Sequence, residues 1–186
     1  MTLPYKKTDH GDLINPPRAD GVERSPFYEK FPPPIRNMPQ GNGFDFHVYF
    51  WQNNAKSVKS IIKLHDDFRR EFPEIRVYMI HSKPVGPHTV GMFEINTFSP
   101  LETGVVFSWM VVNRGEHSVL IHPHTDDPVH EHSVLATWMG QPVPIDLEML
   151  ATFEELMKSG KSRPEIGEIL AKRTEDLNAS LDSLKL

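Results

Sequence analysis

The order of hydrophobic periodicities between residues 44 and 122 is the feature that most constrains the fold. Apolar and polar residues alternate from Phe44 to Phe50, which predicts a half-buried strand. Residues 54–72 then place apolar side chains at helical spacing until Pro73 ends the helix. Further patterns predict a strand, a strand, a helix and a strand, at residues 75–80, 91–98, 100–113 and 118–122. This β-α-β-β-α-β order predicts a ferredoxin-like α+β sandwich with an antiparallel sheet.

The prolines divide the chain into an arm and a domain. Eight of the seventeen prolines lie in the first 43 residues, a density that blocks both helices and ladders. We therefore interpret residues 1–43 as an extended arm. Its aromatic side chains favour an arm that lies along the domain or a partner chain, although a disordered leader fits the composition equally well. Residues 44–140 form the predicted ferredoxin-like domain.

Two amphipathic helices are expected in the remaining residues, 141–186. The first spans residues 146–158, and the second begins at Pro164. The second helix places five apolar side chains on one stripe: Ile169, Leu170, Leu177, Leu181 and Leu184. We expect these helices to pack on the domain or on a partner subunit.

Charge and composition exclude several classes of function. The chain contains no cysteine and ten histidines, so any bound metal must have nitrogen and oxygen ligands. A net charge of -5 argues against a general nucleic-acid binder. The most apolar stretch, Val105–Val112, is too short to cross a bilayer, and the N-terminus lacks the apolar core of a secretory signal. We therefore expect a cytoplasmic protein that binds neither nucleic acid nor membranes.

Strand alternation brings three potential metal ligands to one face of the predicted sheet. Strand 1 of this fold lies between strands 4 and 3, and His47, Glu94 and His122 all project away from the helices. Two imidazoles and one carboxylate form the ligand set of non-haem Fe(II) sites, and zinc accepts the same set. A monomer would expose this face, so a homodimer that packs two such faces together would enclose a cleft. A solvated polar face without metal is the alternative.

A second cluster of histidines lies in the loop that follows the last predicted strand. Five of the ten histidines fall between residues 117 and 132. Two His-x-His pairs in one loop can bind a metal without other ligands. We favour instead a hydrogen-bonded loop in which Asp126 and Asp127 orient rings, while His124 and His130 are exposed. His117 is also interpreted as a residue without a role in the site.

His88 ends the sequence Pro84-Val-Gly-Pro-His88, which predicts a rigid turn. A side chain on a rigid turn is well placed to act as an acid or base, or as an additional metal ligand. The alternative is a turn histidine that makes one hydrogen bond to the backbone.

Several of these segments also form a recognisable set of motifs. They are Phe46-His-Val-Tyr-Phe50, Pro84-Val-Gly-Pro-His88, Met92-Phe-Glu-Ile95, Asn113-Arg-Gly115, Val119-Leu-Ile-His-Pro-His-Thr125, Glu131-His132 and Trp138-Met-Gly140. In this order and spacing they resemble the fungal and bacterial DOPA 4,5-dioxygenase family. The resemblance covers residues 44–140. It leaves out the arm and the C-terminal helices.

The resemblance implies a small, usually dimeric, ferredoxin-like protein that cleaves a catechol such as DOPA with O2 in an extradiol reaction. The histidines of the family motifs match His47, His88, His122 and His132. On this basis we expect Fe(II) as the cofactor and His88 and His132 as the acid and base, although either one can instead be a metal ligand. The chain departs from the family at Thr89, where a proline is usual, and in the loop at residues 125–133.

Three functions are therefore weighed. The first is an Fe(II)-dependent extradiol catechol dioxygenase. The second is a zinc-dependent hydrolase or lyase on the same ligands, whose activity would survive without oxygen. The third is a dimeric binding or interaction protein with a vestigial site, whose subunits exchange their arms. In that third case His47→Ala would leave every measurable function intact.

Overall fold

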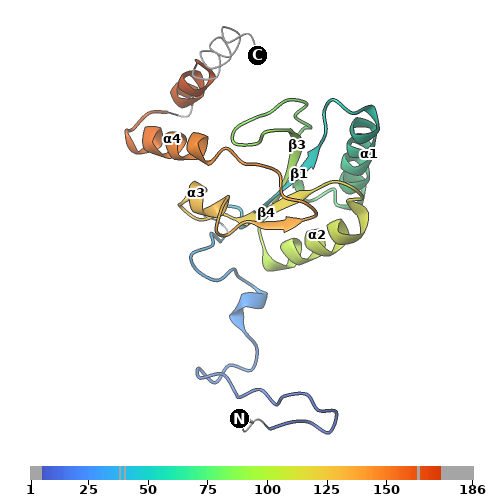
Figure 1. Ribbon diagram of the computed structural model, residues 1–186. Helices are drawn as coiled ribbons and strands as arrows, with labels where there is room; N and C mark the ends of the chain where they lie inside the picture. The colour runs from blue at the N-terminus through green and yellow to red at the C-terminus, as the bar shows by residue number, and fades with distance from the viewer. Residues whose placement is uncertain (1–5, 38, 40, 163, 173–186) are drawn as a thin grey trace, which may run out of the picture.

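The computed structural model describes residues 6–37, 39, 41–162 and 164–172. Its centre is one antiparallel sheet of five strands in the order β2-β3-β1-β4-β5 (Figure 1). The strands are β1 (Phe44–Phe50), β2 (Arg76–Val77), β3 (Gly91–Thr97), β4 (Val119–Pro123) and β5 (Thr137–Met139). The first four strands have the predicted order, with β1 between β4 and β3. The α+β class and the predicted arrangement of the first four strands are therefore confirmed.

Two helices cover one face of the sheet, α1 (Ala55–Glu71) and α2 (Pro100–Asn113). The Asn54 side chain accepts a hydrogen bond from the Ser57 N–H at 3.0 Å, and thereby caps α1. Just after α2, Gly115 has a φ of +59°, a left-handed conformation that favours glycine at a helix end.

The main hydrophobic core lies between these helices and the sheet. The residues of β1, β3 and β4 in this core are Phe46, Val48, Phe50, Phe93, Ile95, Val119 and Ile121. Ile61, Leu64 and Phe68 of α1, Val106 and Met110 of α2 and Met139 of β5 complete it. The alternation of apolar and polar residues therefore assigns the strand residues to the correct faces of the sheet. The apolar ones face the helices, and the remaining side chains of each strand lie on the opposite face.

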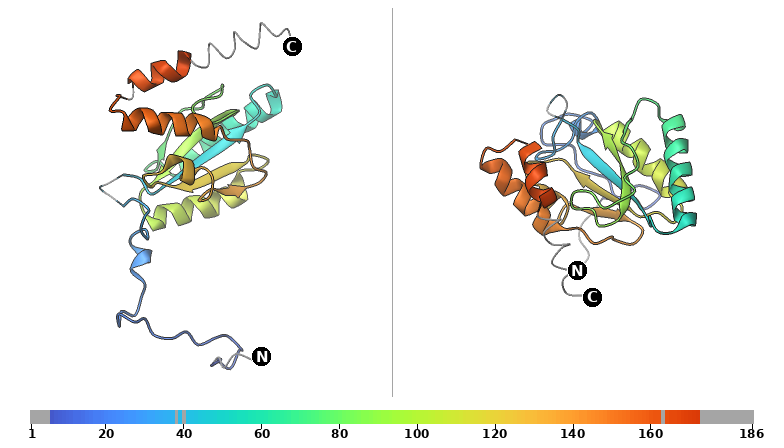
Figure 2. Two further views of the ribbon diagram at one scale, coloured as in Figure 1. Left: turned by 60° about the vertical axis from the view of Figure 1, so that its left-hand side comes forward. Right: turned by 90° about the horizontal axis from the view of Figure 1, so that it is seen from above.

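That opposite face is covered by the same chain, which corrects the expectation of an exposed face. The short helix α3 (Pro128–Glu131) and the helix α4 (Leu147–Lys158) lie over it, on the other side of the sheet from α1 (Figure 2). A second, smaller core of Tyr49, Met92, Leu120 and Val143 closes part of it. A dimer is therefore not needed to enclose the polar side chains. The homodimer itself stays a prediction.

Two strand predictions need correction at the edges of the sheet. The strand expected at residues 75–80 is regular only at Arg76–Val77. Beyond it, the Tyr78 N–H still donates to the Glu94 carbonyl oxygen of β3 at 2.9 Å, and His81 pairs again with Met92. The strand β5 lies beyond the last strand that the sequence predicts. Its three residues are too few to show a periodicity in the sequence. The strand forms because the edge of β4 offers unpaired backbone groups.

The second half of the arm lies along its own domain. Phe31 is 4% exposed and packs against the Phe44 ring, and a Cβ atom on Gly43 would lie 2.0 Å from the Phe31 ring. The one-turn helix η1 (Pro26–Tyr28) lies against α2. Residues 6–24 are all exposed and extend away from the domain (Figure 1). The arm is therefore anchored to its own domain through its second half.

The helix predicted at Pro164 is present over residues 164–172, and its Ile166 side chain is buried. Leu177, Leu181 and Leu184 of the predicted stripe lie outside the described residues. Within the described part of the chain, no helix combines the length and the hydropathy needed to cross a bilayer.

Candidate active site

A cavity of about 290 Å³ opens on the polar face of the sheet. Its wall combines the strands β1, β3 and β4 with the turn before β3, with α3 and α4, and with one residue of the arm. The chemically active side chains in this wall are Arg36, Asp45, His47, His88, Glu94, His122, His124, Glu131 and His132. The four histidines and the one carboxylate that the sequence analysis proposed for the site therefore all line one cavity.

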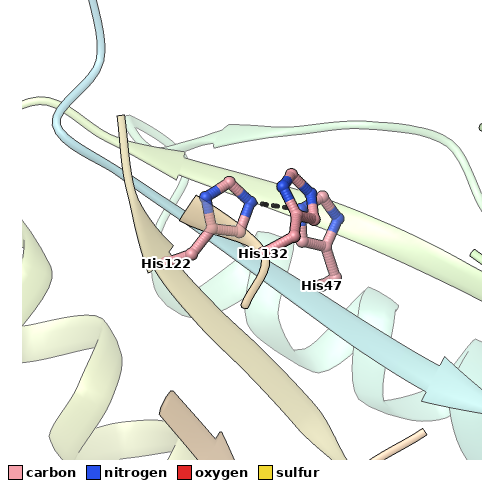
Figure 3. A group of neighbouring side chains, drawn as sticks. All are labelled: His47, His122 and His132. Atoms are coloured by element: carbon pink, nitrogen blue, oxygen red, sulfur yellow. Dashed lines mark hydrogen bonds between the residues drawn. The ribbon is translucent and has the colours of Figure 1, made fainter. Parts of the chain in front are cut away.

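Three imidazoles converge at the floor of this cavity (Figure 3). His47 and His122 are diagonal neighbours on β1 and β4, because Asp45 is the direct partner of His122 in the ladder. Their Nε2 atoms are 3.0 Å apart. His132 at the end of α3 adds the third ring, and one nitrogen from each residue lies within 4.8 Å of the others. This spacing suits three ligands of one metal ion.

Backbone carbonyls fix the proton positions on two of these rings. His122 Nδ1 bonds to the Pro123 carbonyl oxygen at 3.0 Å, and His132 Nδ1 bonds to the Pro128 carbonyl oxygen at 2.9 Å. A carbonyl oxygen only accepts, so both Nδ1 atoms carry the proton. In the neutral rings each Nε2 then has a free lone pair. Metal-binding histidines are oriented in this way in proteins.

His47 supplies the test of whether a metal fits. Because His122 Nε2 is an acceptor, His47 Nε2 donates to it, and His47 Nδ1 is then a bare acceptor. That Nδ1 is buried and has no hydrogen-bond partner among the residues the structure describes. A cation bound to all three Nε2 atoms would move the His47 proton to Nδ1, which lies 3.9 Å from Glu94 Oε2. The donor set therefore fits a metal ion better than it fits the three histidines alone.

Burial keeps the cluster in the state that binds metal. It lowers the pKa of His122 to about 4, with the neighbouring His132 acting in the same direction. Burial also lowers the pKa of His47 well below its usual value, and that of His132 to a smaller extent. All three rings are therefore neutral at pH 7, so a metal does not have to displace protons from them.

Glu94, which the sequence predicts as a ligand, lies beside the cluster but is not one of the three converging groups. It is the direct ladder partner of His47, and its Oε1 accepts a hydrogen bond from Asn96 Nδ2 at 2.6 Å. Burial, with the nearby Asp45 carboxylate, raises the pKa of Glu94. Its position opposite His47 Nδ1 suits an acceptor that orients the ring. Its role as a direct ligand stays a prediction.

His88 lies in the same wall at the end of the predicted turn. Val85 and His88 exchange backbone hydrogen bonds, and the Asp146 N–H donates to the Pro87 carbonyl oxygen at 2.9 Å. The imidazole bonds through Nδ1 to the Tyr49 hydroxyl at 2.8 Å, and its ring centre is 4.3 Å from that of His47. The turn is thus held at both ends, and the side chain faces the cavity. His88 does not use its ring for a backbone bond.

The sequence profile of the Dopa 4,5-dioxygenase family matches residues 44–149. The chain belongs to the Dopa 4,5-dioxygenase family. The matched segment contains every histidine of the cavity and ends inside α4. Membership of this dioxygenase family supports a role as an oxygenase.

Relatives of known sequence or structure agree with this family. An uncharacterized 21.2 kDa protein of Botryotinia fuckeliana is 39% identical over 79% of this chain and 82% of its own length. The DOPA 4,5-dioxygenase of Amanita muscaria is 36% identical over 56% of this chain, a match that spans 48% of that enzyme. The crystal structure of a "putative dioxygenase" from Nostoc punctiforme has a TM-score of 0.51 and 31% identity, and covers 59% of this chain and 91% of that one.

The loop histidines differ in part from the expectation. His124 is half-buried, and it bonds to the Asp45 carboxylate at 2.6 Å. Burial opposes protonation of His124, but this carboxylate outweighs it and raises the His124 pKa. Asp126 and Asp127 do not orient these rings, because Asp126 pairs with Arg36 and Asp127 caps α3. His130 is exposed as expected.

His117 is buried as well, and it bonds to the Tyr49 carbonyl oxygen and to Ser60 Oγ, both at 3.0 Å. It is thus a structural residue of this family member.

Sequence reasoning missed Arg36, Leu150 and Phe153 as parts of the cavity wall. These three residues lie outside the segment 44–140 in which the motifs occur.

The buried histidines predict that the metal-free protein loses stability in mild acid. Burial, with His132 and His122, lowers the pKa of His88 to about 3, and His122 titrates near 4, whereas an unfolded histidine titrates near 6.5. Below pH 6.5 the unfolded chain therefore binds more protons than the folded one. Its free energy of unfolding should fall with decreasing pH, by up to about 1.4 kcal/mol per pH unit for each histidine.

Urea unfolding of chelator-treated protein between roughly pH 5 and 6.5 measures this slope. The variant His88→Asn should have a shallower slope, because one of the titrating groups is gone. His130→Asn removes an exposed histidine and is the matched control. A slope of opposite sign, or equal slopes in His88→Asn and the wild type, would contradict the assignment.

Proposed function

We propose that this protein is an Fe(II)-dependent extradiol dioxygenase that opens the aromatic ring of a catechol with O2. The observation that supports it most is the convergence of three neutral imidazoles on one cavity in a member of a dioxygenase family. His47, His122 and His132 would hold the ion. The remaining wall would hold the substrate.

The proposed reaction needs a metal because O2 is a triplet and reacts slowly with closed-shell catechols. Fe(II) on three facial ligands, when bound, supplies open positions at which the catechol oxygens and O2 are brought together. In the overall reaction one C–C bond next to a hydroxylated carbon breaks. Both atoms of O2 enter the ring-opened product, so no other reductant is required.

The residues of the chain supply the proton transfers and the shape of the site. A catechol hydroxyl must lose a proton when the catechol binds, and His88 is the candidate base because it is neutral and faces the cavity. Burial raises the pKa of Tyr49, so its hydroxyl stays protonated and keeps the His88 ring in place. Leu150 and Phe153 of α4 form the apolar part of the wall, against which an aromatic ring can pack.

Oxygen uptake tests the proposal. Protein loaded with Fe(II) without oxygen and then mixed with air-saturated buffer and a panel of catechols should consume one O2 per catechol. A coloured ring-opened product should appear at the same rate. Apo-protein and zinc-loaded protein are the controls. No uptake with any catechol would overturn the proposal, and activity of the zinc form without oxygen would favour the hydrolase or lyase instead.

A further inference from the structure

Arg36 connects the arm to the cavity. Its backbone N–H donates to the His124 carbonyl oxygen at 2.8 Å, two residues after the metal-site histidine His122. Its side chain is part of the cavity wall and also of an outer groove formed with Ile35, Asn37 and Asp126. Arg36 therefore lies where the cavity meets the surface, and it is held there by the anchored half of the arm.

The charges around Arg36 leave its guanidinium available to a ligand. Among the residues of this wall, all of which the structure describes, it is the only lysine or arginine. Asp45 bonds to Asn96 and His124, and Glu131 accepts from Thr125, so these two carboxylates are already engaged. Arg36 instead contacts Asp126 Oδ1 at 2.7 Å, and the Asp126 side chain is 95% exposed. Exposed ion pairs of this kind are weak, so a ligand can exchange with Asp126.

We propose that Arg36 determines substrate specificity by binding a carboxylate on the ring substituent of the catechol. This inference rests on the proposed function of the site. With the two hydroxyls at the histidine cluster, the ring substituent points toward the opening, where Arg36 lies. The planar guanidinium presents paired N–H groups that match a carboxylate, so a second hydrogen-bonded contact forms at the mouth of the cavity.

The size and charge of the cavity favour this ligand over others. A volume of about 290 Å³ is at the low end for ligand pockets and suits a single ring with a short substituent. Asp45, Glu94 and Glu131 line the same cavity and would repel a dianionic phosphate more strongly than a single carboxylate. A cationic substituent would be repelled by the positively charged guanidinium itself. A short monoanionic substituent is the remaining match.

The test compares 3,4-dihydroxyphenylacetate, which carries a carboxylate, with uncharged 4-methylcatechol. The measured quantity is the ratio of their kcat/KM values, and the ratio of their dissociation constants without oxygen is measured in parallel by calorimetry. Arg36→Gln should lower the preference for the carboxylate substrate about 10- to 100-fold in both ratios. Arg36→Lys, which keeps the charge but loses the paired N–H groups, should lie between Arg36→Gln and the wild type.

Lys30→Gln is the matched control, because it removes the same charge from an exposed position of the arm outside the cavity. It should keep the wild-type ratios. Equal ratios in Arg36→Gln and the wild type would overturn the role of Arg36 without affecting the proposed function. Wild-type protein that binds both catechols but turns over neither contradicts the proposed function, and the binding ratio then decides the role of Arg36. Wild-type protein that binds neither catechol overturns both.

Discussion

His122→Ala is expected to lower the affinity of the protein for Fe(II) by more than about 100-fold and to remove oxygen consumption with it. The variant deletes one of three nitrogens that already face one another and that are neutral at pH 7. The remaining two imidazoles cannot hold the ion facially. The metal content of dialysed protein and a competition titration against a chelator measure the loss.

Two controls separate ligand loss from unfolding. His130→Ala removes an exposed histidine from the neighbouring helix α3 and should bind metal like the wild type. His122 is 1% exposed, so circular dichroism of His122→Ala must first show a folded protein. His132→Ala should show a similar loss of metal from a less buried position. Wild-type metal content in folded His122→Ala and His132→Ala would contradict the three-histidine centre.

His88→Gln is expected to lower kcat about 100- to 10,000-fold while the protein keeps its full complement of metal. Glutamine retains a polar group of similar length but has no basic nitrogen that can take up the catechol proton and return it. The three converging nitrogens do not include His88, so metal binding should survive. Single-turnover kinetics with a saturating catechol separate this effect from substrate affinity.

Two further variants serve as comparisons for His88→Gln: Tyr49→Phe is a milder change at the same site, and His65→Gln is a control outside it. Tyr49→Phe removes the 2.8 Å hydrogen bond to His88 but leaves the imidazole, so a smaller loss of kcat is expected. His65 lies on α1, on the other side of the sheet, where it bonds to the Tyr78 carbonyl oxygen. Its variant should have wild-type kcat. A metal-depleted His88→Gln protein would show that His88 is a fourth ligand instead of an acid or base.

The polar face of the sheet shows how far strand periodicity determines a site. A period of two assigns every residue of β1, β3 and β4 to a face, and one buried apolar face fixes the register. His47, Glu94 and His122 could therefore be placed together from the sequence. Periodicity says nothing about ring rotation, so the convergence of His47 and His122 on His132, with Glu94 set back, needed the structure.

Two parts of the site follow no local period and were harder to place for a physical reason. His132 lies at the end of a one-turn helix, whose position depends on the Asp127 cap and on contacts with α4. Arg36 enters the cavity only because Phe31 and the His124 carbonyl group anchor the arm. Contacts of this kind join segments that are distant in sequence and follow no local period. The Pro84–Pro87 turn is closer to the opposite case, because the hydrogen bonds between Val85 and His88 close it locally.

The most direct test of the central claim is mass spectrometry of the product formed under isotopically labelled O2. Iron-loaded protein and a catechol should give a ring-opened product that contains both labelled oxygen atoms, and His122→Ala should give none of it. An unlabelled product, or one formed equally well without oxygen, would contradict the assignment of this histidine centre as a ring-cleaving dioxygenase site.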